Sequence, residues 1–135
     1  NHFKKVTVDY AVQFAKTLKA NSPKAKFCLL SGAGADNKEK SRISFARYKG
    51  ITENQIKNTG LEFYSFRPGY IYTVESRNEP NFYYRIFRWI YPIIKMLGKN
   101  YSVKSTELAS AMFYIGINGA NKSMIENREI IKFSY

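Results

Sequence analysis

With 135 residues, 44% of them hydrophobic and 16% aromatic, the chain is long enough for one domain with a sizeable core and too apolar to be disordered. No apolar run approaches the ~20 residues that cross a bilayer, and the one cysteine, Cys28, cannot form an internal disulfide, so we expect a cytoplasmic protein. The formal net charge is +12, but lysines and arginines are scattered singly, without an RNP, zinc-finger or helix-turn-helix signature, so we expect no specific nucleic-acid binding.

Helices and strands alternate in the first half of the chain. Apolar residues recur at helical spacing over residues 7–20, which predicts an amphipathic helix. The apolar run at residues 25–30 is typical of a parallel strand covered on both faces. After a polar loop we expect a helix over residues 41–58, ended by Thr59-Gly60. Residues 61–66 predict a second strand, rich in aromatic side chains.

The second half predicts a loop, an amphipathic helix, a short extended piece, a strong helix and a closing strand or connection. These segments cover residues 70–80, 81–97, 101–103, 105–115 and 125–130. Tyr70-Ile71-Tyr72 is also compatible with an extension of the preceding strand. Ser105 is predicted to cap the strong helix, and residues 116–121 are turn-like.

This order of elements indicates an α/β fold built from parallel βα units. The expected architecture is an incomplete Rossmann-like parallel sheet flanked by helices, equivalent to the C-terminal half of a doubly wound fold. Two or three strands are too few for an independent sheet of this kind. We therefore expect one sheet edge to be completed by a missing N-terminal half or by another copy of the chain.

Three short motifs lie at the ends of the predicted strands and on the helix between them. Ser31 ends the first strand, the helix carries Phe45-Ala46-Arg47-Tyr48-Lys49, and the second strand is followed by Arg67-Pro68-Gly69. This order resembles the catalytic half of atypical short-chain dehydrogenases/reductases. The most similar members are relatives of the Tat-interacting-protein oxidoreductases and of the NAD-dependent epimerases/dehydratases.

The resemblance implies a role for each motif. Ser31 would hydrogen-bond the substrate oxygen, and Lys49 would bind the nicotinamide ribose. The family places a tyrosine four residues before the lysine, and this chain has Phe45 there, which has no proton to donate. Tyr48 is a poor substitute because it points about 100° away from Lys49 on the helix, so we expect it to pack on a neighbour.

The turn after the second strand would contribute cofactor contacts from Arg67, Pro68, Gly69 and Tyr70. The alternatives are structural. Ser31 is equally compatible with a hydroxyl bonded to local backbone, and Lys49 with an ordinary surface lysine. The turn is also compatible with a rigid corner in which Arg67 forms a salt bridge.

The chain lacks the glycine-rich cofactor motif with which the resembled enzymes begin. Residues 32–37 contain two glycines after a strand, but the third glycine of a dinucleotide fingerprint is absent. We therefore expect a C-terminal portion whose complete protein binds NAD or NADP, with no cofactor bound by this chain alone. The only histidine is His2, and no metal-ligand spacing is present, so no metal site is predicted.

The amphipathic segment at residues 82–97 carries basic residues on one sector and a wide apolar arc on the other. It is compatible with a core or lid helix, a subunit interface or a membrane-surface helix, and the resemblance favours the first. The predicted function is that of an NAD(P)-dependent oxidoreductase or epimerase-like protein acting on an unknown small molecule. The alternatives are a non-catalytic dinucleotide-binding regulatory or assembly protein and, less favoured, a basic nucleic-acid or membrane-surface adaptor.

Overall fold

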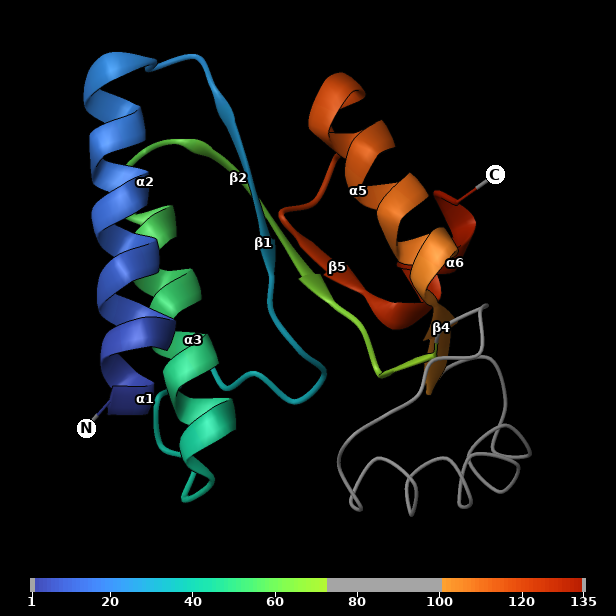
Figure 1. Ribbon diagram of the computed structural model, residues 1–135, viewed down its shortest axis with the longest axis horizontal. Helices are drawn as coiled ribbons and strands as arrows, with labels where there is room; N and C mark the ends of the chain where they lie inside the picture. The colour runs from blue at the N-terminus through green and yellow to red at the C-terminus, as the bar shows by residue number, and fades with distance from the viewer. Residues whose placement is uncertain (1, 73–100, 135) are drawn as a thin grey trace.

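The computed structural model describes residues 2–72 and 101–134 (Figure 1). The chain begins with α1 (His2–Lys4), a π-helical turn η1 (Lys5–Asp9) and α2 (Tyr10–Asn21), which follow one another without a break. The predicted helix therefore starts earlier than Thr7. A long-range contact favours the extension, because the ring of Phe3 lies 5.8 Å from that of Tyr48.

Three parallel strands form the main sheet. They are β1 (Lys26–Leu30), β2 (Glu62–Arg67) and β5 (Met124–Glu126), in the order β1-β2-β5. A second, two-stranded parallel sheet pairs β3 (Tyr70–Tyr72) with β4 (Ser102–Lys104). Residues 70–72 are thus a separate strand and do not extend β2.

Helices cover both faces of the main sheet. Figure 1 shows α2 and α3 (Ser44–Lys57) together on one face, and α5 (Ser105–Asn118) with α6 (Asn127–Lys132) on the other. The central strand β2 serves both cores, because alternate residues of a strand point to opposite faces. Phe63 packs in the cluster with α2 and α3, whereas Phe66 packs in the cluster with α5 and α6. The prediction of a parallel α/β sheet flanked by helices is confirmed.

Helix α3 starts at Ser44, three residues after the predicted start at Ser41. The backbone N–H of Ser41 donates to the Asp36 carboxylate at 2.7 Å, which holds Ser41 in the preceding loop. At the other end, the predicted Thr59-Gly60 termination agrees with the structure, where Gly60 adopts a φ of 74°.

The C-terminal helices differ from the predictions in three details. Ser105 is the first residue of α5 and not its cap, and the Glu107 carboxylate accepts a hydrogen bond from the Lys104 N–H at 2.8 Å. The helix continues past Gly116, which packs close to Cys28 of β1, and ends before Gly119, whose φ is 78°. Residues 125–130, predicted as a strand or connection, are divided between β5 and α6.

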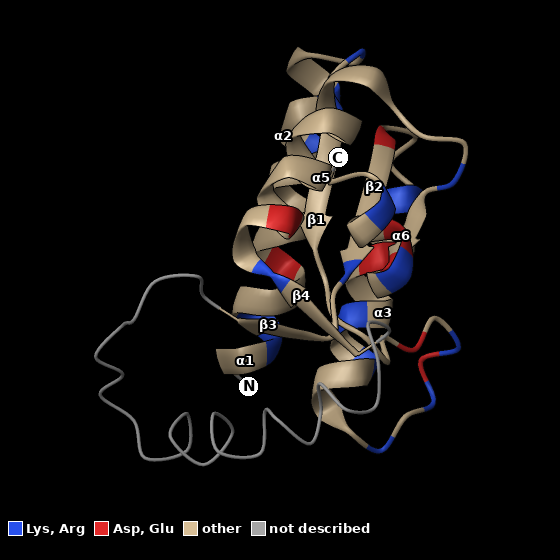
Figure 2. Cartoon of the chain, turned by 90° about the vertical axis from the view of Figure 1, so that its right-hand side faces the viewer, with Lys and Arg blue, Asp and Glu red and all other residues tan. Residues whose placement is uncertain are grey.

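Basic residues occur on several elements, with acidic residues among them (Figure 2). This agrees with the scattered charges of the sequence. In the described ranges, no helix is both long and apolar enough to cross a membrane. The predicted helix at residues 82–97 lies outside the described residues.

Candidate functional site

The loops that follow β1 and β2 meet at the C-terminal end of the two strands. The strands are parallel, so their C-terminal ends lie together. The Ser31 N–H donates to the Phe66 carbonyl at 2.8 Å, and the Ala33 N–H donates to the Pro68 carbonyl at 2.9 Å. Two of the sequence motifs, Ser31 and the Arg67-Pro68-Gly69 turn, are therefore neighbours in the fold.

A cavity of about 290 Å³ lies between these loops and α3. The described residues that line it come from the two loops, the first turn of α3 and β3: Ser31, Gly32, Ala33, Phe45, Pro68, Gly69 and Ile71. Apart from the Ser31 hydroxyl, their side chains are apolar. Open α/β sheets bind ligands at the C-terminal ends of their strands, so this cavity is the candidate site.

The Ser31 hydroxyl is buried beside the cavity. Only 7% of the residue is exposed, and its Oγ has no partner of full hydrogen-bond geometry among the described residues. The Glu53 carboxylate is in contact with this hydroxyl, and a side-chain interaction with Ser31 helps to lower the Glu53 pKa. Because this contact falls short of full hydrogen-bond geometry, a ligand oxygen in the cavity would offer the hydroxyl a better acceptor.

Phe45 forms one wall of the cavity, and Lys49 lies behind it. The Phe45 residue is 45% exposed, and its ring presses so closely on Gly32 that an added Cβ there would lie 2.8 Å from it. The Lys49 Nζ lies 5.8 Å from the centre of the Phe45 ring and donates to the Leu30 carbonyl at 3.0 Å. The four-residue spacing thus brings both side chains to the end of β1.

Burial lowers the pKa of Lys49, and the negative charge of Glu53 partly opposes this effect. Lys49 is therefore neither a fully solvated surface lysine nor a cavity-lining residue. An ammonium group has three N–H donors. The bond to the Leu30 carbonyl uses one of them and leaves donor capacity for a ligand.

Arg67 forms a buried ion pair with Glu53, a partner that the sequence did not identify. Its guanidinium binds Glu53, with Nε–Oε1 at 3.0 Å and a second contact through Nη2, and it reaches Glu126 at 3.2 Å. This is the salt-bridged corner that the sequence left open as an alternative. Arg67 is not among the described cavity-lining residues, so its cofactor contact stays a prediction.

Glu53 is the main residue beside the candidate site that sequence reasoning missed. It is fully buried in α3, and its carboxylate accepts hydrogen bonds from Ser65 at 2.7 Å and Asn37 at 2.8 Å. Burial alone would raise the pKa of Glu53, but interactions with Arg67, Ser65, Ser31 and Asn37 outweigh it and lower the pKa. The sequence feature that could have indicated Glu53 is its spacing, because it lies one helical turn after Lys49 and so shares its helix face.

The loop after Ser31 is fixed by its own hydrogen bonds and by α3. The Asp36 carboxylate accepts from the N–H groups of Lys38, Lys40 and Ser41. The Asp36 carbonyl lies so close to Gly50 that an added Cβ there would be 1.8 Å from it. Only a glycine at position 50 allows this approach, and the loop is held beside the cavity as a result.

Gly69 and Tyr70 make packing contacts and hydrogen bonds within the chain. A Cβ on Gly69 would lie 2.3 Å from the Tyr101 carbonyl oxygen, and the Gly69 N–H donates to Asn127 at 2.8 Å. Tyr70 begins β3, and its N–H donates to Tyr101 at 2.8 Å. Pro68 and Gly69 line the cavity, whereas Tyr70 is not among its described lining residues. Tyr48 packs beside Phe3 as predicted.

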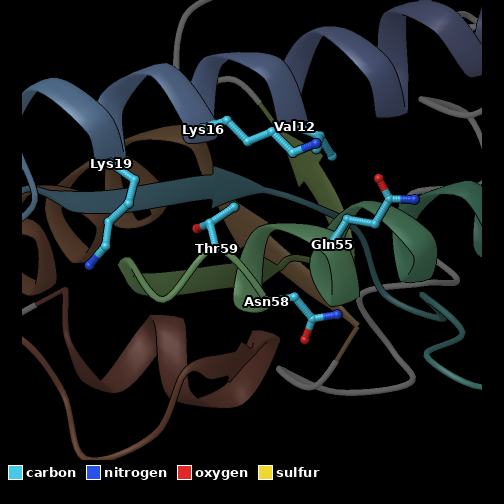
Figure 3. Close-up of a pocket in the computed structure, with 6 residues that line it drawn as sticks. All are labelled: Val12, Lys16, Lys19, Gln55, Asn58 and Thr59. Atoms are coloured by element: carbon cyan, nitrogen blue, oxygen red, sulfur yellow. The ribbon is translucent and has the colours of Figure 1, made fainter.

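A larger cavity of about 390 Å³ lies elsewhere, between α2 and α3 (Figure 3). The described lining residues are Val12, Lys16, Lys19, Gln55, Asn58 and Thr59. None of the predicted site residues contributes to it. We place the candidate site at the smaller cavity, because four residues of the sequence motifs line it: Ser31, Phe45, Pro68 and Gly69.

No protein-family model matches the chain, and no curated protein is significantly similar to it. The resemblance to atypical short-chain dehydrogenases/reductases therefore depends on Ser31, on the spacing of Phe45 and Lys49, and on the Arg67-Pro68-Gly69 turn.

Proposed function

We propose that the chain is the substrate-side portion of an NAD(P)-dependent oxidoreductase related to the atypical short-chain dehydrogenases. The observation that supports this proposal is the buried Ser31 hydroxyl, which has no partner of full hydrogen-bond geometry among the described residues, in a cavity walled by Phe45. A carbonyl oxygen of a substrate would accept a hydrogen bond from this hydroxyl.

In this proposal, each residue of the site has a separate role in carbonyl reduction. Ser31 donates to the carbonyl oxygen and so orients it and stabilises the negative charge that develops there. A nicotinamide cofactor supplies the hydride when bound. Lys49 would bind the ribose with the N–H donors that its bond to the Leu30 carbonyl leaves over. Pro68 and Gly69 border the same cavity. Because Phe45 has no proton to give, the proton for the product alcohol would come from water or from another group.

The second candidate is a non-catalytic dinucleotide-binding protein that serves regulation or assembly. Phe45 favours it, since the resembled enzymes use a tyrosine at that position. A third class, a basic nucleic-acid or membrane-surface adaptor, is less favoured because the positive charges are dispersed over several elements.

A redox turnover assay separates the first two candidates. The complete protein, which on this proposal carries a glycine-rich N-terminal half, is incubated with NADH or NADPH and a panel of ketones and aldehydes. The oxidoreductase proposal predicts cofactor oxidation that depends on the carbonyl compound and falls in Ser31→Ala. Cofactor binding without turnover would instead establish the non-catalytic alternative.

A further inference from the structure

The chemistry of the cavity lining restricts the kind of substrate that fits. Of the described lining residues only Ser31 has a polar side chain, and the others are Gly32, Ala33, Phe45, Pro68, Gly69 and Ile71. A volume of about 290 Å³ lies near the lower end of the roughly 300–1,000 Å³ typical of small-molecule sites. A compact and mostly apolar molecule matches both properties.

Among the described residues, the charged side chains near the cavity do not line it. The Lys49 ammonium lies behind the Phe45 ring, where it donates to the Leu30 carbonyl. The Arg67 guanidinium is paired with Glu53 and Glu126. A carboxylate or phosphate in the cavity would lose its hydration without gaining a free cation from the described lining. Burial of such an unpaired charge is costly.

Phe45 provides a surface for an aromatic or aliphatic group. Its ring is held from one side by Gly32 and is 45% exposed. Aromatic side chains bind apolar partners through large contact areas. A phenylalanine at this position thus adds an apolar wall beside the single hydroxyl.

We propose that the site takes a compact, neutral, apolar carbonyl compound, or the corresponding alcohol, and not a charged sugar nucleotide. The proposal rests on the proposed function of this cavity as a substrate site. It adds the class of substrate, with Ser31 as the hydrogen-bond donor and Phe45 as the apolar contact.

The test compares three ligands of similar shape on the chain itself, without cofactor. They are acetophenone, its hydrocarbon analogue α-methylstyrene, and phenylglyoxylate, which adds a carboxylate. Binding is followed through the NMR shifts of the Gly32, Ala33 and Ile71 backbone amides. Acetophenone should bind about 2- to 10-fold more tightly than α-methylstyrene, the ratio expected of one net hydrogen bond. Phenylglyoxylate should bind more weakly than acetophenone.

Two variants test whether the Ser31 hydroxyl causes the preference for the ketone over the hydrocarbon. Ser31→Ala should remove the preference for the ketone over the hydrocarbon and keep the hydrocarbon affinity. The control Ser110→Ala changes an exposed serine on α5 and should leave the preference intact. The proposal is overturned if phenylglyoxylate binds most tightly, if the ketone preference survives Ser31→Ala, or if none of the three compounds binds. Ketone binding without turnover in the complete protein would overturn the oxidoreductase function and leave the ligand class standing.

Discussion

On the proposed function, Phe45 and Ser31 determine the chemistry of the cavity. The hydroxyl of Ser31 is buried without a partner of full hydrogen-bond geometry among the described residues, whereas Phe45 is half exposed and borders the same space. The site would thus offer a hydrogen-bond donor to a substrate oxygen but lacks, among these two residues, a group that gives up a proton. A single substitution at position 45 adds such a group.

Phe45→Tyr in the complete protein should increase carbonyl reduction. The new phenol lies one helical turn from Lys49, whose positive charge favours the phenolate. General acid–base catalysis typically contributes about 100- to 10,000-fold. Because position 45 borders the cavity, the substitution should change the unfolding free energy only slightly. Cofactor oxidation and denaturant unfolding are measured on the same samples. A large loss of stability without a gain in activity would contradict the alignment of Phe45 with the family tyrosine.

Glu53→Gln should destabilise the fold strongly. The substitution keeps the size of the side chain but leaves the Arg67 guanidinium, which is mostly buried, without its main countercharge. Removal of one partner from a buried ion pair costs about 3–5 kcal/mol. Glu129→Gln is the matched control, because its partner Lys122 is exposed and such surface pairs contribute about 1 kcal/mol or less. Equal effects of the two variants in urea unfolding would argue against a structural role for the buried pair.

The same pair makes stability depend on pH. The pKa of Glu53 is lower in the folded chain than its ordinary value, so its contribution is present above the unfolded pKa of about 4.3. The contribution is lost as the pH falls through the folded pKa. The stability difference between the wild type and Glu53→Gln should accordingly be full at neutral pH and shrink below about pH 4.

At the scale of elements, two glycines inside helices differ in the space around them. Gly50 of α3 faces the Asp36 carbonyl, where an added Cβ would lie 1.8 Å from the oxygen. Gly116 of α5 faces the Cys28 Sγ, where an added Cβ would make an ordinary contact of 3.7 Å. The contact at Gly50 fixes the loop beside the cavity, whereas Gly116 leaves room for a methyl group.

Gly50→Ala should destabilise the chain and Gly116→Ala should stabilise it. Both changes gain about 0.5–1 kcal/mol of helix preference. At position 50 the clash with backbone outweighs that gain, since overpacking typically costs about 1–3 kcal/mol or more. Thermal unfolding of both variants shows whether each is less stable or more stable than the wild type. A stabilised Gly50→Ala would show that the loop does not pack on α3 as described.

Local patterns in the sequence were sufficient for β1, β2 and α3, because each has an apolar period or run bounded by turn residues. The pairing of β3 with β4 depends on contacts between segments about thirty positions apart, which no local pattern records. Glu53 was missed for a similar reason. An acidic residue on a helix predicts exposure, and only the approach of Arg67, Ser65 and Asn37 explains its burial.

At the scale of the whole molecule, the main sheet has an open edge at β1. Among the described strands, β1 pairs with β2 only. A row of rings leads from the core to this edge: Phe63 lies 6.2 Å from Phe27, and Phe27 lies 5.7 Å from Phe14, which is 60% exposed. Unpaired strand backbone beside exposed aromatics favours a partner. On the proposed function, this partner is the glycine-rich half or, without it, a second copy of the chain.

The isolated chain should self-associate, and more strongly at high salt. The edge provides the attraction, while the net charge of +12 makes copies repel one another until salt screens the charges. Sedimentation velocity at low and high ionic strength measures both effects. A folded monomer at high protein concentration in both salts would count against β1 as an interaction edge.

The most direct test of the central claim, that this chain is one half of a dinucleotide site, is a calorimetric titration with NADH and NADPH. The chain alone should bind either cofactor weakly or not at all, because it lacks the glycine-rich helix N-terminus that would hold the pyrophosphate. The complete protein should bind one of them, and Lys49→Met should weaken that binding about 10-fold or more through loss of charged hydrogen bonds. Low-micromolar binding by the chain alone, or no binding by the complete protein, would contradict the claim.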